Sequence, residues 1–120
     1  MIQEFKLDFA YVEQVFESEK EYVHFLMLMH AEFQEAVGRI CQSIREQNLY
    51  ALRKTLHNVD AHLQMLCAED VRNLLAQVKA NLAGPPLAQE QKQQMQEEVQ
   101  GLFEKLLQGL SSKIRQDHHL

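Results

Sequence analysis

The chain has 120 residues, of which 46% are hydrophobic and 24% are charged, so it can bury a core as a single domain over residues 1–120. Its net charge of −5 argues against nucleic acid as the main partner, because duplex binding requires many Lys and Arg residues. No apolar stretch of about 18 residues is present, so we expect no membrane span, and the N-terminus lacks a secretory signal pattern. Cys41 and Cys67 do not form a C-x-x-C pair, and we interpret them as reduced, mostly buried thiols of a cytoplasmic protein.

The first half of the sequence predicts a short helix followed by a long one. Apolar residues at helical spacing predict the short helix over about residues 8–16. Ser18 and Glu21 have the S-x-x-E form of a capping box, so a second helix is expected to begin here. An apolar stripe continues that helix to about Glu46, and its members are Tyr22, Leu26, Met29, Phe33, Val37, Ile40 and Ile44.

A central helix is predicted to follow, with Asn48 as its N-cap and its end near Leu66. Its apolar stripe is Leu49, Leu52, Leu56, Val59, Leu63 and Leu66. His57 follows Leu56 and lies about 100° round the helix from it. We therefore expect His57 to be exposed near the middle of the helix, while Leu52, Leu56, Val59 and Leu63 are buried. The same strip of surface as His57 carries Arg53, Asp60, Ala61 and Gln64.

Two further helices complete the expected fold. The fourth is marked by apolar residues from Val71 to Leu82 and ends before Gly84-Pro85-Pro86. The last should run from about Ala88 to Arg115 with an inner face of Met95, Val99, Leu102, Leu106, Leu110 and Ile114. Residues 116–120 are expected to form a frayed, disordered end. The sequence thus predicts an all-α fold without β-sheet. Because the connections are short, we expect an antiparallel up-down four-helix bundle with a short additional N-terminal helix.

The six histidines do not have the spacing of a metal site. The pairs His24 and His30, and His57 and His62, project from different faces of their helices. One E-x-x-H pattern occurs, from Glu21 to His24, whereas a di-iron bundle needs that pattern on two helices. We predict no metal site, and a tight bundle with short loops offers few pockets for small-molecule catalysis.

The stretch NLYALRKTLHNVDAHLQMLCAE, residues 48–69, resembles the central helix of histidine phosphotransfer (HPt) domains. In that family an amide or acidic residue caps the helix, a Leu follows in its first turn, and the phosphorylated His comes about nine residues after the cap. An apolar residue then stands two positions after the His, and the helix ends in a Leu-Gly-Ala-like corner. The matching residues here are Asn48, Leu52, His57, Val59 and Leu66-Cys67-Ala68.

The resemblance implies that His57 accepts and donates a phosphoryl group in a two-component phosphorelay. The expected partner is a receiver domain of a response regulator or hybrid histidine kinase. That partner would supply Mg²⁺, so the chain would need no cofactor of its own. The surface that would dock the partner consists of Arg53, Lys54, Asp60, Ala61 and Gln64.

The third, fourth and fifth residues after His57 depart from the family pattern, which has Lys, Gly and a small residue at these positions. This sequence has Asp60, Ala61 and His62. A carboxylate one turn from a dianionic phosphoryl group would repel it, so Asp60→Lys is expected to increase phosphorylation. His62 is expected to add bulk beside the site. Two alternatives remain: a degenerate HPt-like module that binds a receiver or kinase without phosphotransfer, and an unrelated helical interaction domain.

Overall fold

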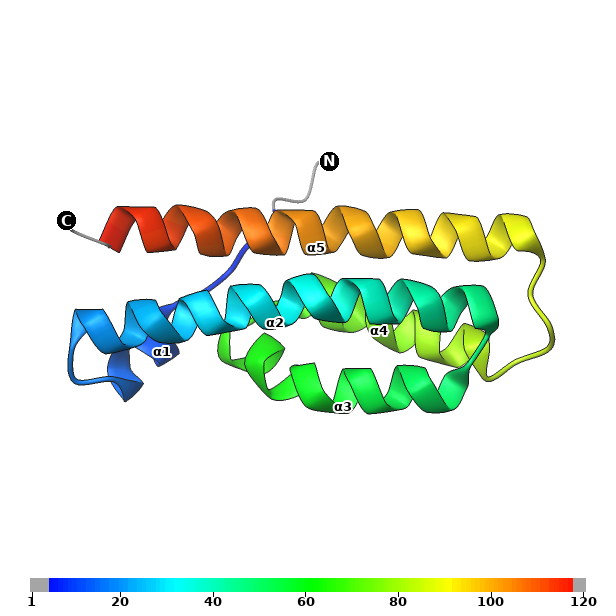
Figure 1. The fold of residues 1–120 in the computed structure, drawn as a ribbon, viewed down its shortest axis with the longest axis horizontal. Helices are drawn as coiled ribbons and strands as arrows, with labels where there is room; N and C mark the ends of the chain where they lie inside the picture. Colours follow the sequence, from blue (N-terminus) through cyan, green and yellow to red (C-terminus); the bar gives the residue numbers. More distant parts are fainter. Residues whose placement is uncertain (1–4, 118–120) are drawn as a thin grey trace.

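The computed structural model describes residues 5–117, which form five α-helices and no β-strand within that range (Figure 1). The all-helical prediction is confirmed for these residues. The α1 helix is shorter than expected, and α5 continues to Asp117, where we expected a frayed end. The expected disorder of His118 to Leu120 concerns residues outside the described range. The helices are α1 (Ala10–Val15), α2 (Glu19–Glu46), α3 (Leu49–Met65), α4 (Glu69–Leu82) and α5 (Gln89–Asp117).

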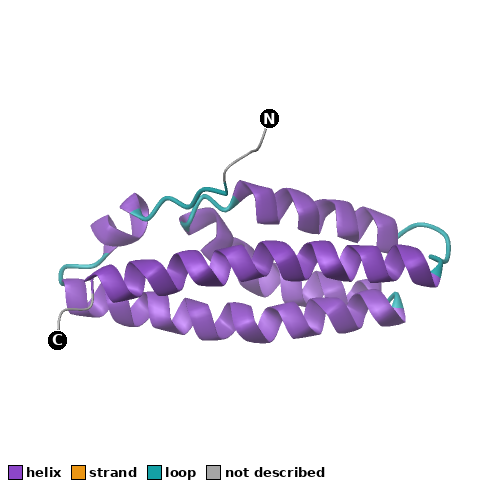
Figure 2. Ribbon diagram, turned by 90° about the horizontal axis from the view of Figure 1, so that it is seen from above, coloured by secondary structure: helices purple, strands orange, loops and turns teal. Residues whose placement is uncertain are grey.

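The two longest helices, α2 and α5, lie side by side along the long axis of the molecule (Figures 1 and 2). The α3 helix packs on α2 and on α4, and α4 returns to contact α5. Consecutive helices from α2 to α5 reverse direction, because the connections between them are short (Figure 1). The α1 helix lies against the first half of α2. The principal extents are 49 × 33 × 21 Å.

Both predicted N-caps are confirmed. Oγ of Ser18 accepts a hydrogen bond from the backbone N–H of Glu21 at 3.1 Å, and α2 begins at Glu19, directly after Ser18. Oδ1 of Asn48 accepts from the backbone N–H of Ala51 at 3.0 Å, which starts α3. Each oxygen satisfies a backbone donor that has no partner inside its helix.

The helices α2 and α3 end in the same way, with one residue in the left-handed conformation. Gln47, after α2, has φ 47°, and Cys67, after α3, has φ 54°. After α3, the N–H of Cys67 bonds the carbonyl of Gln64, and the N–H of Ala68 bonds that of Leu63, both at 3.0 Å. This is the Schellman arrangement, which satisfies the last carbonyls of a helix and turns the chain sharply. Cys67 thus stands where the HPt-like pattern has Gly.

The core contains most of the apolar residues that the stripes predict. The exceptions on α2, α3 and α4 are half-buried, namely Val37, Leu49, Leu56 and Leu74. On α5, Leu102 and Ile114 are also half-buried, and Phe103 is buried instead, with its ring centroid 6.3 Å from that of Phe33. The buried face of α5 is therefore rotated slightly from the predicted one.

The cysteine prediction is half wrong. Cys41 is buried, and burial raises the pKa of its thiol. Cys67 is exposed, because it occupies the turn after α3 rather than a helix face. Both thiols are free.

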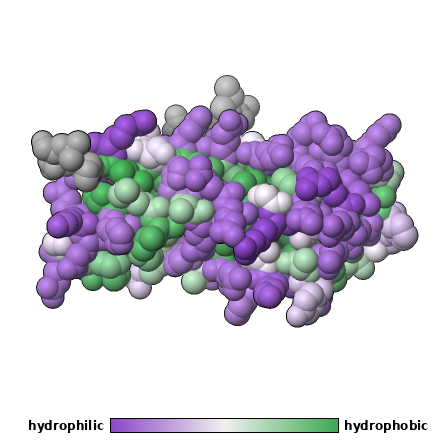
Figure 3. Space-filling model, in the orientation of Figure 1, coloured by the Kyte–Doolittle hydropathy of each residue, from purple (hydrophilic) through white to green (hydrophobic). Residues whose placement is uncertain are grey.

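Some large apolar side chains remain at the surface. In the space-filling view, apolar surface gathers at the end of the molecule where α1 and the start of α2 lie (Figure 3). Among all described residues, the large apolar side chains that are exposed are Tyr11 and Val15 on α1, Met27 and Leu28 on α2, and Tyr50 on α3. None of the described helices is long and apolar enough to span a bilayer.

Candidate functional site

His57 is exposed near the middle of α3, as the apolar stripe predicts. The opposite face of this helix is anchored in the core, because Leu52, Val59 and Leu63 are at most 2% exposed. A helix fixed in this way cannot rotate, so the imidazole is held at the surface on a rigid support.

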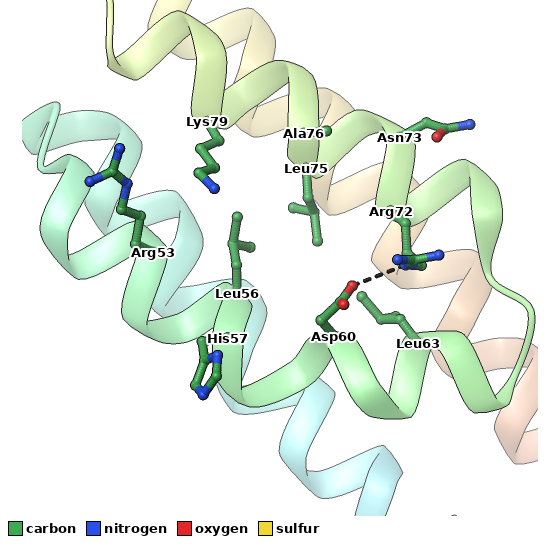
Figure 4. Close-up of a pocket in the computed structure, with 10 residues that line it drawn as sticks. All are labelled: Arg53, Leu56, His57, Asp60, Leu63, Arg72, Asn73, Leu75, Ala76 and Lys79. Carbon is green, nitrogen blue, oxygen red and sulfur yellow. Dashed lines mark hydrogen bonds and ion pairs between the residues drawn. The ribbon is translucent and has the colours of Figure 1, made fainter.

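His57 lies at the rim of an open groove between α3 and α4, with a volume of about 620 Å³ (Figure 4). Leu56 and Leu75 face each other across it. Arg53 and Lys79 lie at one end of the groove, and the ring of His57 points away from α4. The sequence did not predict this concavity, since it depends on how far apart α3 and α4 pack. All lining residues are Arg53, Leu56, His57, Asp60, Leu63, Arg72, Asn73, Leu75, Ala76 and Lys79.

Asp60 closes the other end of the groove by pairing with Arg72 of α4. Nε of Arg72 donates to Oδ1 of Asp60 at 2.9 Å, and Nε2 of Gln64 donates to Oδ2 at 2.7 Å. A second nitrogen of Arg72 lies 3.5 Å from a carboxylate oxygen of Glu69. The hydrogen bond from Arg72 is the main reason that the pKa of Asp60 is lowered, and partial desolvation opposes it. Asp60 is therefore an ionised carboxylate whose charge is offset by a guanidinium.

His62 does not crowd His57, contrary to the expectation from sequence. Its ring turns toward α2, where Nδ1 lies 2.9 Å from a carboxylate oxygen of Glu32. The edge of the ring packs against Phe25 with centroids 5.4 Å apart. The bulk of His62 is thus accommodated between α2 and α3, because it lies about 140° from His57 round the helix.

The structure brings together some of the predicted site residues and adds others. Arg53 and Asp60 line the groove with His57. The other three predicted docking residues, Lys54, Ala61 and Gln64, are exposed on α3 outside it.

Sequence analysis missed the contribution of α4, namely Arg72 and Lys79. These two cations are seven residues apart, so they lie on one face of a helix. This spacing was a usable signal, but only once the partner of that face was known to be α3.

The described side chains do not form a metal centre. Within residues 5–117, no three His, Cys, Asp or Glu residues come together in a way that could hold a metal ion. The chemistry available at the groove is thus that of an exposed imidazole beside three cations and one carboxylate.

Comparison of the chain with protein-family models, with curated proteins and with solved structures finds no significant match.

Proposed function

We propose that this chain is a histidine phosphotransfer protein that relays a phosphoryl group through His57 between receiver domains of a two-component phosphorelay. In this proposal α2 to α5 form an antiparallel up-down four-helix bundle, with α1 as the additional N-terminal helix, and the protein works in the cytoplasm. The observation that carries the proposal is the exposed imidazole at the middle of a helix whose other face is anchored in the core.

The chemistry requires only an accessible nucleophile on this chain. A ring nitrogen of His57 attacks the phosphorus of an aspartyl phosphate on the receiver, the N–P bond forms, and the P–O bond to the aspartate breaks. The aspartate leaves as a carboxylate, and the reverse reaction passes the phosphoryl group to the next receiver. Mg²⁺ and the groups that stabilise the transferring phosphoryl come from the receiver, so this chain needs no cofactor.

Exposed apolar side chains on α3 and on the adjoining α2 support docking of a partner. Tyr50 is 80% exposed and lies two turns before His57 on the same strip of α3. Leu28 is 55% exposed and shares a strip of α2 with Phe25 and Glu32, which both contact His62 of α3. Apolar side chains exposed on adjoining helices are a feature of protein interaction sites.

The test is transfer of labelled phosphate from a phosphorylated receiver domain with Mg²⁺ to the wild type, His57→Gln and His24→Gln. His24 is also exposed, on α2, and serves as the matched control. We expect an acid-labile, base-stable label on the wild type and on His24→Gln and none on His57→Gln. Label that persists on His57→Gln would contradict the proposal, as would no label from any of a panel of receivers.

A second candidate is a degenerate HPt-like module that binds a receiver or kinase without phosphotransfer. Asp60 and Ala61 favour it, because the family pattern has Lys and Gly at these positions. It predicts that a receiver binds the wild type and His57→Gln with equal affinity while neither becomes labelled. If no receiver binds at all, the third alternative, an unrelated helical interaction domain, is favoured.

A further inference from the structure

The groove beside His57 concentrates positive charge on an acidic protein. Its lining contains the cations Arg53, Arg72 and Lys79 and one carboxylate, Asp60, which gives a formal charge of +2. The whole chain carries −5. Only Arg53 comes from the helix of His57, and the other two cations come from α4.

The three cations differ in whether they form an ion pair. Arg72 is held by Asp60 at 2.9 Å. The structure gives Arg53 and Lys79, which lie at the other end of the groove, no ion pair with a described residue (Figure 4). The side chain of Lys79 extends from α4 toward Leu56, the residue next to His57 (Figure 4). Two cationic groups are thus available to an anion that sits between them.

Reach and geometry fit an anion attached to His57. Arg53 precedes His57 by four residues, a spacing at which Cβ atoms on a helix are about 5–6 Å apart. Among the described residues, no side chain forms a hydrogen bond with the His57 ring, so rotation about its side-chain bonds can turn it toward the groove. A phosphoryl group on the ring would extend this reach further.

We propose that the α3–α4 groove binds the phosphoryl group carried on His57, with Arg53 and Lys79 as its direct cationic partners. This inference rests on the proposed function and deepens it. It assigns to α4 the role that the HPt-like pattern gives to a Lys three residues after the His, where this chain has Asp60. Arg72 acts through Asp60, because it offsets the one negative charge that would repel the phosphoryl group.

The test uses phosphoramidate, a small phosphoryl donor that needs no partner protein, on the full chain. The imidazole attacks phosphorus, the P–N bond of the donor breaks, and ammonia leaves. The variants are Arg53→Gln and Lys79→Gln, with Lys105→Gln on the exposed face of α5 as the control of equal charge change. The readouts are the half-life of the phosphohistidine and the pH titration of its ³¹P signal.

We expect each groove variant to shorten the half-life or lower the yield by about three- to ten-fold, the size of losing one unit charge near a dianion at intermediate dielectric. The pKa of the phosphoryl group should rise in both groove variants, because nearby cations favour its dianionic form. Lys105→Gln should match the wild type in both readouts. A purely structural role for Lys79 would not move the titration.

Equal half-lives and equal titrations in all four proteins would overturn the inference and leave the relay proposal standing. If phosphoramidate labels the chain and the groove variants weaken this labelling, but no receiver transfers its phosphoryl group, the relay proposal is contradicted and the inference is supported. If the wild type takes label neither from phosphoramidate nor from any receiver, the relay proposal and the inference are both overturned.

A second experiment adds inorganic phosphate and follows the amide chemical shifts of the chain. It distinguishes binding of the free ion from binding of the covalent phosphoryl group. A phosphoryl group on His57 that occupies the groove should prevent free phosphate from binding there. If phosphate causes the same amide shifts whether or not His57 is phosphorylated, the inference is contradicted.

Discussion

Arg72 of α4 donates a hydrogen bond from Nε to Oδ1 of Asp60 of α3 at 2.9 Å, so the carboxylate three residues after His57 is paired across the groove. From the sequence alone, this carboxylate would face a phosphoryl group unpaired. The pair changes what Asp60 does, because a guanidinium within hydrogen-bonding distance cancels most of its field at longer range.

The pairing predicts strong coupling between these two residues. Arg72→Gln should shorten the lifetime of phosphohistidine 57 on the order of ten-fold, because it removes a cation and leaves the Asp60 charge uncompensated. Adding Asp60→Asn to Arg72→Gln should restore most of the loss, whereas Asp60→Asn alone should change little. The lifetimes of the four proteins form a double-mutant cycle. Additive effects would show that Arg72 does not act on the phosphoryl group through Asp60. For the same reason, Asp60→Lys should gain less than the sequence suggests, since it sets a new cation against Arg72.

The same pair predicts a pH dependence of stability. The hydrogen bond from Arg72 lowers the pKa of Asp60 in the folded state. A lowered pKa stabilises the fold above the unfolded value of about 3.9, and this contribution is lost as pH falls through the folded pKa. The wild type should therefore be more stable than Asp60→Asn at pH 7, and the gap should close in acid. The effect is small, since the Asp60 side chain is 46% exposed.

Urea unfolding at neutral and acidic pH measures this gap, with Arg72→Gln as the background in which it should vanish. A gap of equal size at both pH values would mean that Asp60→Asn acts through something other than the charge of the pair.

The fold was largely predictable from sequence, because four long apolar stripes and two side-chain caps define the helices locally. The site was only partly predictable. The exposure of His57 follows from its angle to Leu56 on one helix. The roles of Arg72 and Lys79 do not follow, because they depend on the packing of α4 against α3. Likewise, the contact of His62 with Glu32 joins residues 30 positions apart, which helix periodicity cannot reveal.

Two histidines of α3 should differ in their effect on stability. His57→Gln should change the free energy of unfolding by less than about 0.5 kcal/mol, since the side chain is exposed. His62→Gln should cost about 0.5–1.5 kcal/mol, because it loses the contact with Glu32 and the packing on Phe25. Denaturant unfolding of both variants at pH 7 gives the comparison. A larger loss for His57→Gln would mean that this ring has a structural role.

The two left-handed helix ends give a matched pair of glycine substitutions. Cys67→Gly should stabilise the protein by about 0.5–1 kcal/mol, because Gly adopts φ 54° without the steric cost of a side chain. Gln47→Gly should not, since the Gln47 side chain accepts from the N–H of Leu87 at 2.8 Å and donates to the carbonyl of Pro85 at 3.1 Å. Melting temperatures of the two variants test this, and an equal gain in both would show that the Gln47 bonds contribute nothing.

The most direct test of the central claim locates the phosphoryl group. A ¹H–³¹P correlation spectrum of the chain, recorded after transfer from a phosphorylated receiver, identifies the modified side chain among the six histidines. The account predicts a single phosphoryl group on a ring nitrogen of His57. A phosphoryl group on His24, His30 or His62, or on a carboxylate, would contradict it.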